Sequence, residues 1–348
     1  EFSAGVPVVY IASGTGYADA LSAAPAAARQ GGPLLLVPPT SVPAVVVAEL
    51  QRLKPALIVV VGSAGAVSAQ SYAHLAELAP DIRRDGGADR YATSRAVIER
   101  AFSSSASAFV ATGENFPDAL SASAAAGSIG APVLLVKGRS SSISSPEAAL
   151  LRTLSVTKVT VVGAASVVSA GIENSLRTVA GVDVVVRAAG ADRYATAVRV
   201  NELSFTDAQR AFFAVGTGFA DALAGAALAG AVGAPLYVVP KTCVSGAVRN
   251  QLSSFGTTGY TLLGGSDVLS DAVGALTVCP VVVPPAPPKP PTPPAPPKNP
   301  GDTKNCGDFA TYAAALAWFK TYFPLYGDVA RLDQDNDGIP CESLPGAP

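Results

Sequence analysis

The 348-residue sequence predicts an α/β protein: three tandem repeats with parallel sheets, followed by a small disulfide-bonded, EF-hand-like module at the C-terminus. Three observations predict this organisation. A motif recurs about every hundred residues, short apolar segments alternate with Ala-rich ones, and a proline-rich stretch separates the last repeat from an acidic segment bounded by cysteines. The hydrophobic fraction of 49% is rich in Ala and Val, which is typical of small helices packed on buried parallel strands.

The repeat carries three landmarks. The first is Gly-x-x-aromatic-x-Asp-Ala-Leu, whose aspartates are 99 and 103 residues apart. The second is an apolar strand that ends in Gly, at steps of 101 residues, with Ser six residues later. The third, Asp-Arg-Tyr-Ala-Thr, occurs at 89–93 and 192–196, and the copy expected for the first repeat would lie upstream of Glu1. The aspartates are Asp19, Asp118 and Asp221, and the strand-end glycines are Gly62, Gly163 and Gly264.

Each repeat is expected to form a four-stranded parallel sheet covered by helices. In the middle repeat, β-rich runs alternate with helical stretches, and apolar strands joined by helices require parallel crossovers. Asp89 and Asp192 are placed to cap helices, and Pro117 suits a first helical turn. The predicted strands of this repeat cover residues 109–112, 132–136, 158–162 and 183–187.

The composition changes at residue 280, where a run of prolines begins. The run predicts a polyproline spacer between the repeats and the tail. One helix face is expected in the tail, at Phe309, Tyr312, Ala313, Leu316 and Phe319. The expected domains are therefore repeats at 1–88, 89–191 and 192–279, a linker at 280–301 and the small module at 302–348.

The four cysteines are expected to form two disulfides, since none has the CxxC spacing of a zinc or redox site. Pairing each cysteine with its nearest neighbour keeps both bridges inside one module, as Cys243–Cys279 and Cys306–Cys341. The alternative is four buried free thiols. Disulfides indicate a secreted protein in an oxidising setting. The chain starts at Glu1 without a signal peptide, so any secretion signal is expected to have been removed or left out.

Charge and motifs argue against several functional classes. With 24 Lys plus Arg and 26 Asp plus Glu, nucleic acid is not an expected partner, and no apolar run is long enough for membrane insertion. Gly216-x-Gly218 after a strand hints at dinucleotide binding, but Asp221 stands where the third glycine would be needed. With His74 as the sole histidine and no hydrolase motif, we expect no catalytic centre.

The tail contains an acidic loop with the spacing of a calcium site. Asp333, Asp335 and Asp337 occupy positions 1, 3 and 5, and Gly338 follows at position 6. This pattern wraps three carboxylates and a backbone carbonyl, here that of Ile339, around one hard cation. The alternative is a solvated acidic turn.

The three landmarks together resemble the cell wall-binding repeat family, whose members tether surface proteins non-covalently to anionic polymers of the Gram-positive wall. The resemblance covers roughly residues 4–279. It implies three repeats around a pseudo-threefold axis, a secreted and wall-associated location, and a wall polymer or peptidoglycan as partner. The alternative function is that of an accessory targeting fragment of a wall-active enzyme whose catalytic domain precedes Glu1.

The candidate polymer-binding residues lie in the Asp-Arg-Tyr-Ala-Thr motifs. A guanidinium binds phosphate or carboxylate in a bidentate manner, and a neighbouring tyrosine can stack on a sugar. In the alternative, each arginine pairs with a nearby aspartate and each tyrosine belongs to the core. The candidates are Arg90, Tyr91, Arg193 and Tyr194.

The tail resembles the Excalibur module, an extracellular calcium-binding domain related to the EF-hand. It matches in the two cysteines and in the acidic loop. At loop position 12, Leu344 replaces the bidentate Glu of a standard EF-hand, and the resemblance implies Glu342, at position 10, as the substitute. The expected cofactor is therefore calcium.

Overall fold

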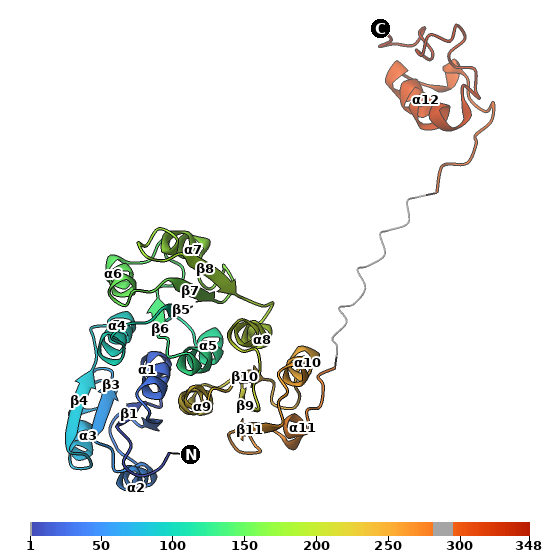
Figure 1. Cartoon of the computed structure of the whole chain (residues 1–348). Coiled ribbons are helices and arrows are strands. Elements are labelled where there is room, and N and C mark those ends of the chain that lie inside the picture. Colours follow the sequence, from blue (N-terminus) through green and yellow to red (C-terminus); the bar gives the residue numbers. More distant parts are fainter. Residues whose placement is uncertain (1, 281–294) are drawn as a thin grey trace. The chain divides into compact units, whose positions relative to one another are not determined.

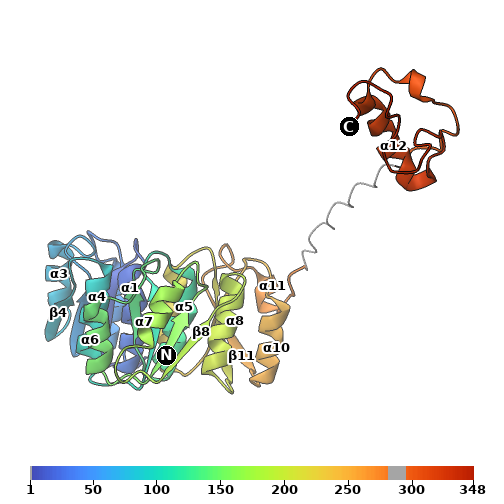
Figure 2. The ribbon, with the colours of Figure 1, turned by 90° about the horizontal axis from the view of Figure 1, so that it is seen from above.

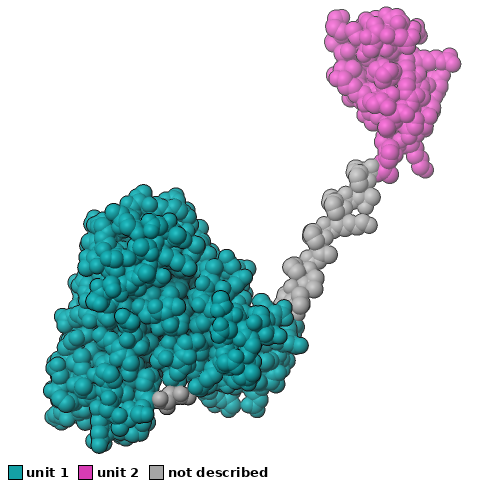
Figure 3. All heavy atoms as spheres, viewed as in Figure 1, with its two compact units in different colours: residues 1–281 teal, residues 282–348 magenta. Residues whose placement is uncertain are grey.

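The protein consists of two compact units in the computed structural model, residues 1–281 and residues 282–348 (Figure 3). The structure describes residues 2–280 and 295–348. Among these residues, no helix combines the length and the apolar composition needed to cross a bilayer.

The first unit contains three parallel sheets, one for each repeat (Figure 1). Their strand orders are β2-β1-β3-β4, β6-β5-β7-β8 and β10-β9-β11. The four strands predicted for the middle repeat are confirmed, with ends shifted by at most two residues. The strands are β1 (Val8–Ser13), β2 (Leu34–Val37), β3 (Leu57–Val61), β4 (Asp81–Asp85), β5 (Ser107–Thr112), β6 (Val133–Val136), β7 (Lys158–Val162), β8 (Val184–Ala188), β9 (Arg210–Val215), β10 (Leu236–Val239) and β11 (Gly259–Leu263).

Helices connect successive strands, and three Ala-rich ones, α1, α5 and α9, pack together at the centre of the unit (Figure 1). In Figure 1 these central helices are seen nearly end-on, and Figure 2 shows the helices from the side. The helices of this unit are α1 (Ala18–Arg29), α2 (Ala44–Leu53), α3 (Ala69–Ala76), α4 (Arg90–Ala101), α5 (Pro117–Ser128), α6 (Ser145–Thr153), α7 (Ala170–Leu176), α8 (Arg193–Ser204), α9 (Ala220–Ala231), α10 (Gly246–Ser254) and α11 (Asp271–Gly274).

The central helices approach closely because their contact positions hold Ala or Gly. A Cβ added to Gly127 of α5 would lie 3.0 Å from the Cα of Gly230 on α9 and 3.0 Å from the Cβ of Ala28 on α1. Each central helix also packs on a strand of another repeat: α1 on β6, α5 on β10 and α9 on β2. The three repeats therefore share one core, arranged with pseudo-threefold symmetry.

The third sheet has three strands within the described residues, so the prediction of four strands per repeat is wrong there. After α11 the chain forms an isolated parallel bridge between Val278 and Val244. Cys279, which follows, forms a disulfide with Cys243 beside that bridge. Pro280 comes next and has no N–H to donate to a sheet, so the sequence at this point cannot continue as a paired strand.

We expect the Cys243–Cys279 disulfide to hold the end of the third repeat. It closes a sequence separation of 36 residues, which corresponds to about 4 kcal/mol in the chain-entropy model. Replacing both cysteines with Ser should lower the free energy of unfolding by up to about this amount. Hydrogen exchange should then quicken first at residues 264–279. Unchanged exchange there, with the disulfide verified in the parent by peptide mapping, would contradict this role.

The second unit is held by one helix, α12 (Tyr312–Tyr326), a short 3₁₀ turn at Cys306–Asp308 and the disulfide Cys306–Cys341. Its buried core contains Ala315 and Phe319. The predicted helix face was therefore partly wrong: Phe309 precedes the helix, whose N-cap is Thr311, and Ala313 is exposed. Of the predicted polyproline spacer, residues 281–294 lie outside the described part of the chain.

Candidate functional site

The N-terminal ends of the three central helices meet at an aromatic triangle. It consists of Tyr17, Phe116 and Phe219, which are equivalent positions in the first landmark. Their ring centroids are 5.4–5.9 Å apart. The aromatic residue of the motif therefore joins the repeats at the symmetry axis.

Beside the triangle, the recurrent aspartates lie against the strand-end glycines. Gly163, with φ of +104°, would place a Cβ 2.8 Å from an oxygen of Asp118, and Gly264 would do the same with Asp221. Both glycines adopt a left-handed conformation that side chains disfavour. Burial raises the pKa of Asp19 and of Asp118, which the nearby Arg90 and Arg193, respectively, partly oppose. These aspartates therefore serve packing at the helix starts, as the structural interpretation of the motif anticipates.

The Asp-Arg-Tyr-Ala-Thr motifs open helices α4 and α8, and their aspartates cap these helices. Asp89 accepts hydrogen bonds from the N–H groups of Tyr91 and Ala92, at 3.0 and 2.8 Å. Asp192 accepts one from Ala195, at 2.8 Å. Both caps were predicted from the sequence.

Each motif arginine reaches into the following repeat. Arg90 donates to the carbonyl of Gly113 and also, at 3.2 Å, to the hydroxyl of Tyr17. Arg193 donates to the carbonyl of Gly216 at 2.5 Å. One N–H of each guanidinium is thus anchored on backbone, Arg90 is exposed, and Arg193 is partly exposed. The partners are carbonyls rather than the nearby aspartates.

Tyr91 faces a second set of polar side chains that sequence reasoning missed. The Lys137 ammonium lies 5.8 Å from the centre of the Tyr91 ring. Arg95 approaches Glu147 at 3.9 Å in the same pocket, whose volume is about 230 Å³. Serines at 140, 142 and 144 complete its lining. No local motif marks Lys137, because its position beside Tyr91 depends on how α4 packs on the second sheet.

In the second unit, the acidic loop gathers its carboxylates. Oxygens of Asp333, Asp335 and Asp337 lie within 4.8 Å of one another. The Asp333 carboxylate accepts hydrogen bonds from the N–H groups of Asp337 and Gly338, at 3.2 and 2.8 Å, which curls the loop around it. Gly338 has φ of +90°, a conformation that favours glycine.

The neighbouring charges act on Glu342 as well. The carboxylates of Asp337, Asp335 and, less strongly, Asp333 raise its pKa. Glu342 thus lies in the field of all three loop acids, although it is fully exposed. An all-oxygen donor set with this much negative charge suits calcium chemically.

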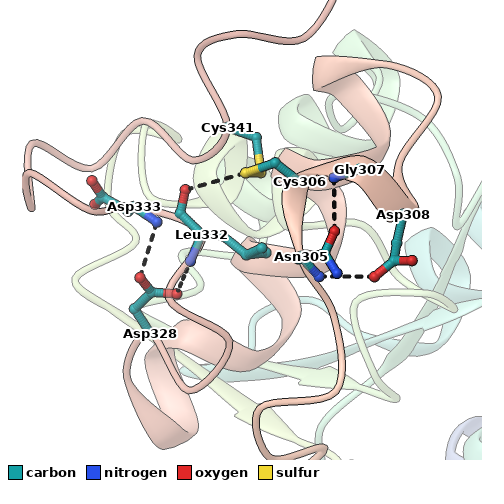
Figure 4. Close-up of a disulfide and its surroundings, with 8 residues drawn as sticks. All are labelled: Asn305, Cys306, Gly307, Asp308, Asp328, Leu332, Asp333 and Cys341. Carbon is teal, nitrogen blue, oxygen red and sulfur yellow. Dashed lines mark hydrogen bonds between the residues drawn. A yellow bond between two sulfur atoms is a disulfide. The ribbon is translucent and has the colours of Figure 1, made fainter.

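The start of this loop is fixed by Asp328 and by the disulfide (Figure 4). The Asp328 carboxylate accepts hydrogen bonds from the N–H groups of Leu332 and Asp333, at 2.8 and 2.9 Å. On the opposite side, the thiol sulfur of Cys306 lies 3.9 Å from the Leu332 carbonyl. Sequence reasoning missed Asp328, because an aspartate outside the 1, 3, 5 spacing gives no local signal.

The comparisons with known proteins match the repeats as well as the tail. The model of the family described as cell wall binding domain 2 matches residues 1–72, 84–173 and 187–274. The chain belongs to this cell wall binding family. The model of the Excalibur calcium-binding domain matches residues 303–342. Both sequence resemblances are therefore confirmed.

Curated relatives share the repeats over part of their length. The N-acetylmuramoyl-L-alanine amidase LytC of Bacillus subtilis (strain 168) is 25% identical over 272 residues, which are 78% of this chain and 53% of the amidase. The amidase enhancer of the same organism is 25% identical over 258 residues, which are 74% of this chain and 34% of the enhancer. The chain thus spans about half or less of the length of these relatives.

Solved structures share the fold. Cwp8 from Clostridium difficile has a TM-score of 0.72 and 25% identity, over 79% of this chain and 47% of Cwp8. Cwp6 from the same organism has a TM-score of 0.70 and 24% identity, over 78% of this chain and 44% of Cwp6. The arrangement of three parallel α/β repeats in the cell wall binding family therefore extends to this chain.

Proposed function

We propose that the repeats attach the protein to an anionic polymer of the Gram-positive cell wall, through Arg90 and Tyr91 and through Arg193 and Tyr194. The observation that carries the proposal is the anchoring of each guanidinium by one N–H to a backbone carbonyl. The anchor fixes the arginine while its other donors remain available for a phosphate or carboxylate. Family membership supports the wall as the target.

The charge distribution favours a local patch over long-range attraction. Asp89 and Asp192 lie next to the two arginines, and the chain as a whole has a formal net charge of -2. Attraction of a polyanion must then come from a few close contacts, to which Lys137 adds a third cation beside Tyr91. We therefore expect binding to weaken moderately with added salt, since only a few charges take part.

The test is sedimentation of the full chain with purified cell walls, before and after chemical removal of their anionic polymers. Binding should fall strongly on stripped walls. Replacing both arginines, as Arg90→Gln with Arg193→Gln, should weaken binding to intact walls by about tenfold or more, because a hydrogen bond to a charged group contributes roughly 1.5–3 kcal/mol.

A matched control is Arg52→Gln, which removes an exposed arginine that is paired with Glu49 on α2. It should leave wall binding unchanged. Thermal unfolding of each variant separates lost binding from lost folding. If stripped walls retain as much protein as intact ones, the polymer is not the partner and peptidoglycan itself becomes the candidate.

We also propose that the tail binds one calcium ion through Asp333, Asp335, Asp337, the carbonyl of Ile339 and Glu342. Clustering of the three aspartates and the rise in the Glu342 pKa support this set. Four carboxylates so close together repel one another, and a divalent cation would relieve that repulsion.

A second candidate function rests on the amidase similarity. The repeats could target a wall-active enzyme whose catalytic domain is a separate segment of a longer protein, because the chain matches about half of an amidase. In both cases we propose that residues 1–348 contribute binding rather than catalysis. Assaying the chain on purified peptidoglycan discriminates: release of amino groups or reducing ends by the chain alone would contradict a purely binding role.

A further inference from the structure

The central helices have three equivalent places for a covering strand and helix, and the third is open. In the first sheet, β4 covers the edge of β3 and leads into α4. In the second sheet, β8 covers the edge of β7 and leads into α8. In the part of the chain that the structure describes, β11 pairs with β9 alone. Every residue of β3 and β7 after the first is buried, whereas no residue of β11 is buried and Tyr260 is 42% exposed.

Backbone groups at the open place lack the bonds that their equivalents make. In the first repeat, the Gly62 N–H donates to the Asp85 carbonyl at 2.8 Å, and the Arg84 side chain donates to the Gly62 carbonyl at 2.9 Å. The second repeat makes the same two bonds with Gly163, Ala188 and Arg187 in the corresponding positions. Gly264 is the third such glycine, and no described residue makes either bond to it.

The pockets beside the aromatic triangle show the same difference. The first, of about 320 Å³, lies between Asp19 on one side and Arg90 and Thr93 on the other. The second, of about 210 Å³, has the equivalent lining, with Asp118 facing Arg193 and Thr196. The third is larger, about 530 Å³, and Asp221 in it faces no strand and helix of this kind. We call the third pocket together with the edge of β11 the open slot.

The motif tyrosines and arginines mark what is missing. A Cβ on Gly113 would lie 2.8 Å from the Tyr91 ring, and one on Gly216 would lie 2.6 Å from the Tyr194 ring. The equivalent Gly14 has only atoms of β2 near it, at 3.5 Å or more. The place that a third motif tyrosine would occupy against Gly14 is therefore vacant of such a ring.

We propose that the open slot receives a strand and helix of the Asp-Arg-Tyr-Ala-Thr type, which pair with β11 and run directly into β1. The connectivity determines this occupant. Helix α4 leads into β5, and α8 leads into β9, so each such helix enters the next repeat at its first strand. The helix that packs between the third and first repeats would by the same rule precede β1. Its arginine would reach the Gly14 carbonyl and lie beside Phe219.

The test supplies the segment from the chain itself. A copy of residues 182–205 is placed directly before Ala4 of the full chain, in place of residues 1–3. The copied Phe205 then stands as far before Gly14 as the original stands before Gly216. Amides of β11 should exchange about tenfold more slowly or better, because pairing removes them from solvent. The melting temperature of the first unit should rise by a few degrees.

The matched control carries Arg187→Glu in the copied segment alone, so that the side chain cannot donate to the Gly264 carbonyl. It should lose most of the added protection. Adding the wild-type segment as a separate peptide to the unmodified chain gives a second measurement, which should also slow exchange at β11. Unchanged β11 exchange in both formats would overturn the proposal. So would a dimer of the unmodified chain that protects β11 and persists with the segment attached, since a second copy would then be the occupant.

Discussion

Removing calcium should unfold or loosen the C-terminal unit while leaving the repeats folded. The unit buries few side chains, so it has little core to resist the repulsion among its loop carboxylates. With a Kd of about 10⁻⁴ to 10⁻³ M, the range of extracellular modules, about 10 mM calcium would stabilise it by roughly 1.4–2.7 kcal/mol. Calorimetric unfolding with calcium and with chelator should show two transitions, of which calcium moves one.

The sharpest variant is Asp333→Ala. Its carboxylate lies at loop position 1 and also accepts two backbone hydrogen bonds, so its loss removes both a ligand and the turn. Asp333→Asn keeps an acceptor and separates the two effects: it should retain more of the loop fold yet lose calcium affinity. Magnesium should compete poorly, because it gives up its water reluctantly.

Asp302→Asn is the control for this series, because Asp302 is an exposed tail acid that approaches Arg331 at 3.8 Å and lies outside the loop. Titration calorimetry of the full chain should give the same calcium affinity for this variant as for the parent. An equal heat of binding in Asp333→Ala, or none in the parent at millimolar calcium, would remove the site.

Enlarging the glycines between the central helices should destabilise the whole first unit. Gly127→Leu would push a side chain against Gly230 and Ala28, where even a Cβ has only 3.0 Å. Overpacking of this kind costs about 3 kcal/mol or more for a large side chain and about 1–3 kcal/mol for Gly127→Ala. Denaturant unfolding measures the change.

The sign of the alanine effect makes this prediction specific. In an ordinary helix, replacing Gly by Ala stabilises by up to about 1 kcal/mol. Gly246→Ala is the matched control, because Gly246 begins α10 and a Cβ there would meet nothing within 4 Å. It should be neutral or stabilising. If Gly127→Ala behaves like Gly246→Ala, the close contact at the axis does not limit stability.

Much of the fold was predictable because its signals are local. The caps Asp89 and Asp192 and the strands of the middle repeat follow from residues near them in the sequence. The clustering of the loop aspartates follows in the same way, since alternate positions of a tight loop converge. The missing fourth strand of the third sheet was not predicted, because repetition suggested a strand where the chain instead turns to Cys243.

The partners of the candidate polymer site could not be predicted. Arg90 bonds the Gly113 carbonyl, and Tyr91 neighbours Lys137, only because α4 lies between two repeats. Such contacts depend on crossover geometry and leave no pattern in nearby sequence. The sequence could therefore identify the motif residues but not which of their atoms are committed to the fold.

The packing of each central helix on a strand of another repeat has a consequence for evolution and engineering. In a linear solenoid, repeats contact only their neighbours, and their number can vary freely. Here α1, α5 and α9 form a closed set around one axis, so deleting one repeat would expose the apolar faces of both others. The number of repeats is thus fixed by closure at three, and this segment would be gained or lost as a whole.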